Sequence, residues 1–276
     1  MIRLAGDFLM PDKPRQTEGI EGVSRVLHIG EVPLRVLEGG EGSPLLVLHP
    51  AGGAGRWYPY HAELAKRHRV IAPDHPGFGG TPASHQIDSV DDIAFLYSQL
   101  LDQLGLQTVY VLGLSFGGWV AAELAVLDPH RIDRLVLVNA IGLRIPDHPV
   151  ADLFAMSPAQ KLANLFQDPQ VATQLFAGEP NIDTIMAFYH DDTAFARYAW
   201  QPFCCNPKLS RRLWRITSPT LVLLGGKDRI VPRAHGEFYS KHIANALLKE
   251  IPNAGHGLLL ESLDEAVSAI EQFFAS

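Results

Sequence analysis

The sequence predicts an α/β fold, a mostly parallel doubly wound sheet with helices on both faces and a helical cap inserted into it. Short, nearly continuous apolar runs are typical of strands buried on both faces of such a sheet. Segments of helical period lie between these runs, as expected for right-handed βαβ crossovers, until one long stretch breaks the alternation. The runs are 45–49, 69–73, 108–113, 134–139 and 220–225, with a further predicted strand at 246–251.

The beginning of the chain predicts an arm followed by a hairpin. Residues 1–22 are rich in proline, glycine and charge, and we expect them to form a loose arm or a surface-packed extension. Residues 23–29 and 32–38 are expected to pair as strands across a turn at Gly30 and Glu31.

Two of the predicted helices carry start signals. The first is expected to begin after Ser89 and to end at Gly105, because an N-cap serine precedes apolar residues at helical spacing. The last is expected to begin after Ser262, which stands at capping-box spacing from Glu265.

The stretch that breaks the alternation is 141–212. It has helical period, is punctuated by prolines and contains no strand-like run. We interpret it as a helical cap, so that residues 23–140 and 213–276 together form the core domain.

Composition argues against several classes of partner. The 276 residues carry a net charge of -7 and no block of lysine and arginine, so neither nucleic acid nor membrane is an expected partner. Cys204 and Cys205 are adjacent and offer no disulfide framework, and the first residues lack a sustained apolar segment. We expect a soluble cytoplasmic protein, and no sequence signal indicates its oligomeric state.

Residues 113–117, Gly-Leu-Ser-Phe-Gly, match the G-x-S-x-G pattern and directly follow a predicted strand. A helix is predicted at 116–128. A sharp strand-to-helix turn forces its central residue into strained dihedrals, and the flanking glycines remove side chains that would clash there. This context predicts that Ser115 is a nucleophile presented at the end of the sheet.

A serine hydroxyl needs a base to remove its proton and an acid to orient that base. Asp228 lies just beyond the strand 220–225, and His256 lies beyond the strand 246–251 in a glycine-flanked loop. The chain order Ser, Asp, His, with both partners after later strands, is the order expected for this type of site. Ser115, Asp228 and His256 are therefore the predicted catalytic residues.

Acyl chemistry also needs N–H donors for the developing oxyanion. The backbone N–H of Phe116, next to the nucleophile at a helix N-terminus, is one expected donor. The second is expected from Ala51, with Gly52 as the alternative, because the small residues after the strand 45–49 allow close backbone approach. His49 is expected to brace this loop and not to transfer protons.

Together, these motifs resemble the α/β-hydrolase superfamily over about residues 23–275. Residues 49–53, 74–79 and 225–228, the elbow around Ser115, and His256 stand where that family has its markers. In the family the 74–79 stretch is structural. The resemblance implies the α/β-hydrolase fold and a Ser-His-Asp mechanism that needs no metal or cofactor.

The serine at the elbow narrows the expected chemistry. Epoxide hydrolases and haloalkane dehalogenases of the superfamily carry an aspartate there, so those activities are not expected. The cap resembles that of carbon–carbon hydrolases of ring-cleavage products, but those enzymes usually carry a tryptophan after the catalytic histidine and a polar residue before the nucleophile. This chain has Gly257 and Leu114 at those positions.

We therefore expect hydrolysis of a carboxylic ester or thioester of a small or medium acyl group through an acyl-enzyme on Ser115. Carbon–carbon hydrolysis is the alternative. A small-molecule receptor that retains the triad is a candidate of another class, because fold alone does not decide function.

The substrate pocket is expected to take its walls mainly from the cap, since the loops around the nucleophile are rich in glycine. The predicted substrate-binding side chains are Phe154, Phe188 and Trp200 of the cap and Trp57 of the loop 51–60. His190, Asp191 and Asp192 are interpreted as a solvated cap turn, because three adjacent residues rarely converge on one metal ion.

Overall fold

The computed structural model describes residues 20–175 and 182–276. Most of the predicted N-terminal arm, residues 1–19, lies outside the described residues. Among the residues described, no helix is both long enough and apolar enough to cross a lipid bilayer.

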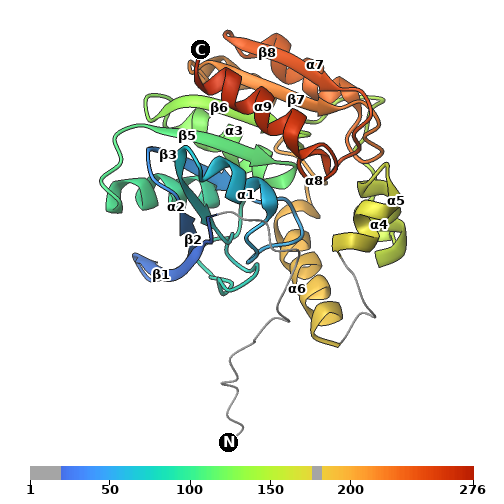
Figure 1. Cartoon of the computed structure of the whole chain (residues 1–276), viewed down its shortest axis with the longest axis horizontal. Helices are drawn as coiled ribbons and strands as arrows, with labels where there is room; N and C mark the ends of the chain where they lie inside the picture. Colours follow the sequence, from blue (N-terminus) through green and yellow to red (C-terminus); the bar gives the residue numbers. More distant parts are fainter. Residues whose placement is uncertain (1–19, 176–181) are drawn as a thin grey trace, which may run out of the picture.

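Eight strands form one sheet in the order β1-β2-β4-β3-β5-β6-β7-β8 (Figure 1). The hairpin β1–β2 is antiparallel and joins β4 in antiparallel sense, whereas every pairing from β4 to β8 is parallel. The predicted mostly parallel sheet is thus confirmed. The strands are β1 (Val23–Ile29), β2 (Val32–Gly39), β3 (Ser43–Leu48), β4 (His68–Pro73), β5 (Val109–Leu114), β6 (Ile132–Val138), β7 (Thr220–Gly225) and β8 (Ala246–Ile251).

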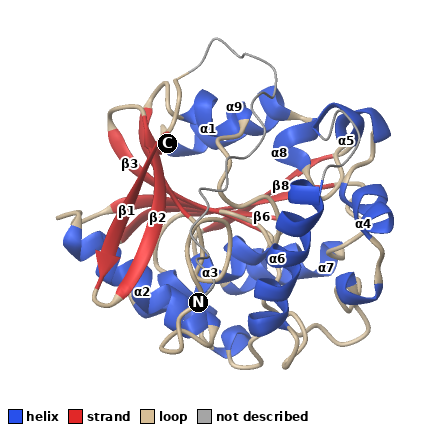
Figure 2. Cartoon of the chain, turned by 90° about the horizontal axis from the view of Figure 1, so that it is seen from below, coloured by secondary structure: helices blue, strands red, loops and turns tan. Residues whose placement is uncertain are grey.

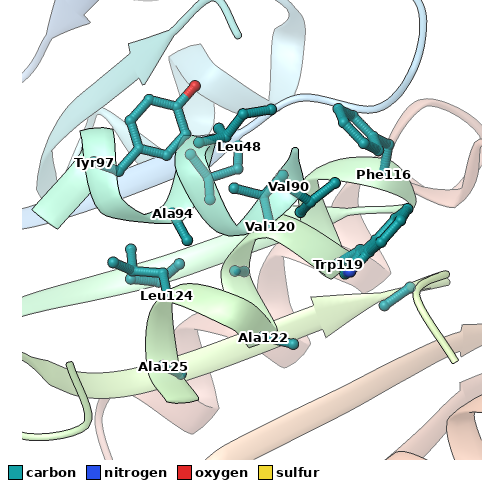
Figure 3. Packing of buried hydrophobic residues seen from close by; sticks show 14 of the residues in the cluster. Leu48, Val90, Ala94, Tyr97, Phe116, Trp119, Val120, Ala122, Leu124 and Ala125 are labelled. Atoms are coloured by element: carbon teal, nitrogen blue, oxygen red, sulfur yellow. The ribbon is translucent and has the colours of Figure 1, made fainter. Parts of the chain in front are cut away.

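Helices cover both faces of the sheet, as predicted (Figure 2). On one face α1 (Pro59–Leu64) and α9 (Leu263–Phe274) pack over a smaller apolar core, with α8 (Leu258–Glu261) beside them. On the other face α2 (Val90–Gln103), α3 (Phe116–Leu127) and α7 (Arg233–His242) enclose a larger one. Figure 3 shows how α2 and α3 interlock there through Ala94, Val120 and Leu124. Burial of apolar side chains on both faces explains why the central strands are nearly continuous apolar runs.

Between β6 and β7 the described residues form helices and no further strand of the sheet, in the segment interpreted above as the cap (residues 141–212). Helices α4, α5 and α6 lie outside the two layers that cover the sheet (Figure 1). The elements between the two strands are η1 (Leu153–Ala155), α4 (Pro158–Leu165), α5 (Pro169–Leu175), α6 (Ile182–Ala199), η2 (Leu209–Arg211) and η3 (Leu213–Arg215).

Both predicted helix starts are confirmed, because α2 begins after Ser89 and α9 begins after Ser262, but only Ser89 makes the expected capping hydrogen bond. The Ser89 hydroxyl accepts the Asp92 backbone N–H at 3.2 Å and caps α2. Ser262 precedes α9, but its side chain makes no capping hydrogen bond. The reason is that Ser262 also ends α8, where its N–H donates to the Leu258 carbonyl at 2.8 Å, and this gives it a backbone conformation that is not the extended one of an N-cap.

Candidate active site

Ser115 occupies a strained turn between β5 and α3. Its φ of 51° and ψ of -109° place a non-glycine residue at positive φ. The turn is tight on both sides, because a Cβ on Gly113 would overlap the Gly117 carbonyl and a Cβ on Gly117 would overlap the Leu48 carbonyl. The Ser115 N–H donates to the Val138 carbonyl at 2.9 Å, which ties the turn to the neighbouring strand. The two glycines of the motif are therefore required by sterics.

His256 and Asp228, which follow β8 and β7, form a buried hydrogen-bonded pair. The distance from His256 Nδ1 to Asp228 Oδ2 is 2.8 Å, and each side chain is 5% exposed. The other carboxylate oxygen accepts the N–H groups of Ile230 at 2.7 Å and Val231 at 2.9 Å, which fixes the carboxylate plane. Because a carboxylate only accepts, the proton of the imidazole is on Nδ1, and Nε2 keeps its lone pair.

Two residues that sequence reasoning did not single out as functional hold the loop that carries His256. Asn139 directly follows β6 with a φ of 45°; its Nδ2 donates to the His256 carbonyl at 2.9 Å and its Oδ1 accepts the Gly225 N–H at 2.9 Å. The Glu261 carboxylate accepts the Gly255 N–H from the other side. The one sequence signal for Asn139 is a polar residue at the end of a buried apolar strand.

A cavity of about 170 Å³ lies between these elements, and Ser115 and His256 both line it. Loop residues from the end of β3 form one side and residues of α4 and α6 form another. Most lining side chains are apolar, and four are charged. Besides Ser115 and His256, its lining residues are Pro50, Ala51, Gly52, Gly53, Arg56, Tyr58, Tyr60, Leu114, Val138, Leu153, Lys161, Leu165, Phe166, Phe188, Asp191, Asp192, Phe195, Gly257, Leu259 and Leu260.

Backbone N–H groups on the cavity wall differ in whether they already have an acceptor. Within the described part of the chain, the N–H groups of Ala51, Gly52 and Phe116 donate to no protein acceptor. The Gly53 N–H, in contrast, donates to Asp191 Oδ2 at 3.0 Å. Ala51, Gly52 and Phe116 thus retain N–H groups that an oxyanion needs.

His49 braces the loop that contains these donors, as predicted. Its Nε2 accepts the His75 backbone N–H at 2.9 Å, and its Nδ1 lies 2.6 Å from the Pro50 carbonyl. Burial lowers the pKa of His49 and so favours the neutral ring that this pair of hydrogen bonds requires. Asp74 is structural as well, since it accepts the Gly55 N–H at 2.7 Å.

Of the four predicted substrate-binding side chains, only Phe188 lines the cavity. On α6, the lining residues Phe188, Asp191, Asp192 and Phe195 follow one helical face. Trp200 is off that face and 63% exposed.

Phe154 and Trp57 also lie outside the lining. Phe154 stacks on the far side of Phe195, with ring centroids 5.2 Å apart. Trp57 turns away to donate its indole N–H to the Ile20 carbonyl at 2.8 Å. The expectation for these side chains is corrected accordingly, and Phe166 and Phe195 supply the aromatic wall in their place.

The interpretation of residues 190–192 as a solvated turn is wrong. They belong to α6, and the Asp191 side chain is only 13% exposed. Burial raises the pKa of Asp191, partly offset by His49 and by the backbone N–H groups that it accepts. Asp192 pairs with the buried Lys161 of α4, whose ammonium lies 5.2 Å from the centre of the Phe188 ring. The spacing of apolar residues along α6 did not indicate this role, because the side chains of Asp191 and Asp192 face the cavity, where apolar side chains are expected.

Comparison with known proteins finds similarity to hydrolases. A 2-hydroxy-6-oxo-6-phenylhexa-2,4-dienoate hydrolase of Comamonas testosteroni is 29% identical over 83% of this chain and 86% of its own length. A 2-hydroxymuconate semialdehyde hydrolase of Pseudomonas sp. (strain CF600) is 29% identical over 92% of this chain and 94% of its own length. The structure of a meta-cleavage product hydrolase from Pseudomonas fluorescens IP01 shares the fold, with a TM-score of 0.77 at 24% identity over 92% of this chain and 98% of that one. A family model described as the alpha/beta hydrolase family matches residues 45–270, and this chain belongs to that family.

Proposed function

We propose that this protein is a serine hydrolase that cleaves a carbon–carbon bond beside a ketone in a dienoate product of ring cleavage. The observation that carries the catalytic part is the His256–Asp228 hydrogen bond with Ser115 on the wall of the same cavity. The bond type is supported by the relatives named for 2-hydroxy-6-oxo-dienoate and 2-hydroxymuconate semialdehyde hydrolysis. This differs from the ester chemistry expected from the sequence.

The chemistry of the relative's substrate dictates which bond water can split. A 2-hydroxy-6-oxo-6-phenylhexa-2,4-dienoate contains a ketone, an enol and a carboxylate but no ester or amide. Hydrolysis must therefore break the C5–C6 bond next to the ketone. When the enol proton moves to C5, the departing fragment becomes a carbanion conjugated with the new 2-oxo group, so its electron pair is stabilised.

In the proposed cycle His256 Nε2 takes the Ser115 proton while Oγ attacks the C6 ketone. The N–H groups of Phe116 and Ala51 hold the oxyanion, and Asp228 stabilises the imidazolium. Collapse breaks the C5–C6 bond, and His256 protonates the leaving fragment. Water activated by the same histidine then releases the acid from Ser115.

The glycine after the histidine is compatible with this function. A Cβ on Gly257 would overlap the ring of Phe166, a buried residue of the cap that lines the cavity. Phe166 therefore supplies, from another part of the chain, an aromatic wall next to His256. The tryptophan that ring-cleavage hydrolases usually carry at this position has no room here, and its absence is a weaker argument against them than the sequence indicated.

The cavity also offers charge for a carboxylate. Arg56 and Lys161 are the basic side chains in its lining, Asp191 and Asp192 are the acidic ones, and the remainder is mainly apolar. The two basic side chains favour an acidic substrate with an apolar tail over a neutral ester, because backbone N–H groups of Gly53 and Gly79 already engage the Asp191 carboxylate. Lys161 is shared with Asp192, so the substrate carboxylate would compete with that pair.

Ester hydrolysis is the second candidate because Leu114, which lines the cavity next to Ser115, is apolar where ring-cleavage hydrolases tend to have a polar residue. A parallel assay separates the two. Wild type and Ser115→Ala are each assayed with the 6-phenyl dienoate and with a series of neutral aryl esters. We expect kcat/KM for the dienoate to exceed that for any ester by at least about tenfold, a modest difference in transition-state binding.

In that assay Ser115→Ala should abolish both activities. Turnover of esters alone would favour the second candidate. Stoichiometric labelling of Ser115 without turnover of either substrate would favour a receptor.

A further inference from the structure

We propose that Asp191 of α6 is a positioning residue for the oxyanion loop, defined here as residues 49–55. In this view the oxyanion site is complete only while this cap helix is seated on the core. The inference rests on the proposed function, because it takes Ser115 as the nucleophile and a backbone N–H at 51 or 52 as an oxyanion donor.

Asp191 spans two core loops that are distant from it in sequence. Its Oδ2 accepts the Gly53 N–H at 3.0 Å, and its Oδ1 accepts the Gly79 N–H at 3.4 Å. Hydrogen bonds from N–H groups to a carboxylate are among the stronger ones, and poor solvent access preserves their strength. One side chain of the cap thus holds two backbone segments of the core.

The bond to Gly53 fixes the far end of the donor segment. At the near end His49 is held by the backbone N–H of His75, which belongs to the core. The donor positions 51–52 lie between these two attachments. Release of Gly53 would let the donors move, whereas oxyanion binding requires each donor to stay within a few tenths of an ångström of its hydrogen-bonding distance from the position of the oxyanion. The contact with Asp191 therefore controls geometry and not affinity for the acyl group.

The partners of Asp191 distinguish it from its neighbour. Asp192 is engaged by the Lys161 ammonium, whereas both Asp191 oxygens face backbone N–H groups. Among the described residues, the one side-chain ion pair of Asp191 is with His190 at 3.9 Å, at the limit of such an interaction. A carboxylate used for substrate recognition would keep an oxygen for the ligand, but here both oxygens hold the loops.

The test compares Asp191→Ala and Asp191→Asn with Asp183→Asn, an exposed acidic residue in the first turn of the same helix. Three quantities are measured: the second-order rate of Ser115 labelling by a small fluorophosphonate, the inhibition constants of a methyl and a phenyl trifluoromethyl ketone, and the melting temperature. The phosphoryl oxygen of the phosphonate adduct and the alkoxide oxygen of the ketone hemiketal both lie where the carbonyl oxygen of a substrate would lie.

We expect Asp191→Ala to slow labelling by about 10- to 100-fold, somewhat less than outright removal of an oxyanion donor. The inhibition constants of both ketones should rise by a similar factor, because the loop holds the oxyanion and not the acyl group. Asp191→Asn should slow labelling less than Asp191→Ala does, since its amide oxygen can still accept the Gly53 N–H. Asp183→Asn should match wild type in every measurement.

Labelling of a folded Asp191→Asn and a folded Asp191→Ala at the wild-type rate overturns the inference. A loss confined to one ketone overturns it as well, because it assigns Asp191 to the wall around the acyl group. If Asp191→Ala does not fold, Asp191→Asn alone decides by the same criteria. If wild type itself is not labelled, both the proposed function and this inference are overturned. That outcome differs from the failure of the inference alone, in which wild type is labelled and the Asp191 variants are labelled at the same rate.

Discussion

The side-chain amide of Asn139 joins the end of β6 to the backbone of His256, with 2.9 Å between Nδ2 and the carbonyl oxygen. The same amide accepts the Gly225 N–H at the end of β7. Asn139 is 1% exposed, so neither of its partners has water as a substitute. This residue therefore sets where the histidine loop lies relative to the strand that precedes Asp228.

Asn139→Ala should lower both stability and kcat. It leaves a buried carbonyl and a buried N–H without partners, which costs about 1–3 kcal/mol for each unsatisfied group. The imidazole then loses its fixed position, so kcat should fall more than KM rises. Urea unfolding and steady-state kinetics measure the two effects. Asn139→Asp, which keeps the acceptor for Gly225 but loses the donor to His256, should show the same kinetic direction, and unchanged kcat in both variants would contradict the positioning role.

Asp228→Asn should reduce kcat by several orders of magnitude, on the order of 10⁴-fold, and leave substrate affinity within about tenfold. An amide in this position can present its NH2 to Nδ1 and so reverse the tautomer of His256. Burst kinetics with a nitrophenyl ester separate the acylation rate from the binding constant. Asp133, an exposed acid in β6, provides the control through Asp133→Asn. Retention of most activity in Asp228→Asn would mean that another group orients the histidine.

Phe188→Ala should change substrate preference, whereas Trp200→Ala should not. Phe188 lines the cavity, but Trp200 is mostly exposed at the end of the same helix. The loss of a ring from an apolar wall reduces discrimination by about 1–3 kcal/mol. The measurement is the order of kcat/KM across acyl lengths, with the rate of phosphonate labelling as a control for an intact triad. An altered order in Trp200→Ala alone would mean that the cavity wall is not where specificity is set.

Glu123 should make the protein less stable as the pH rises. Burial raises the pKa of this carboxyl from 4.5 to about 7, Asp91 contributes in the same direction, and the hydrogen bonds from Asn206 and Trp119 lower it in part. A folded-state pKa above the unfolded value means that the stabilisation is fully present below pH 4.5. It is lost as the pH rises through about 7.

Glu123→Gln removes this dependence and keeps an oxygen that can accept from Trp119 and Asn206. Its melting temperature relative to wild type should therefore increase between pH 5 and pH 8.5. Glu237→Gln, at an exposed position, is the control and should show no such trend. A constant difference between Glu123→Gln and wild type across this range would contradict the prediction.

Local signals were sufficient for the sheet, the elbow and the order of the predicted catalytic residues. Apolar runs specified strands buried on both faces, and β1, β7 and β8 have the predicted bounds. Gly113 and Gly117 mark the turn at Ser115 because steric exclusion acts between residues close in sequence or in adjacent strands. Asp228 and His256 could be placed because parallel strands end at the same edge of the sheet.

The contacts that shape the cavity depend on tertiary structure. Asp191 reaches Gly53 and Asn139 reaches His256 across more than a hundred residues, so no local pattern encodes either bond. On α6, Met186 and Tyr189 face outward while Asp191 faces the cavity, the reverse of what helical amphipathicity indicates. The packing of α6 against the loops of Gly53 and Gly79 reverses that order, because backbone N–H groups of these loops satisfy a carboxylate that hydropathy would assign to solvent.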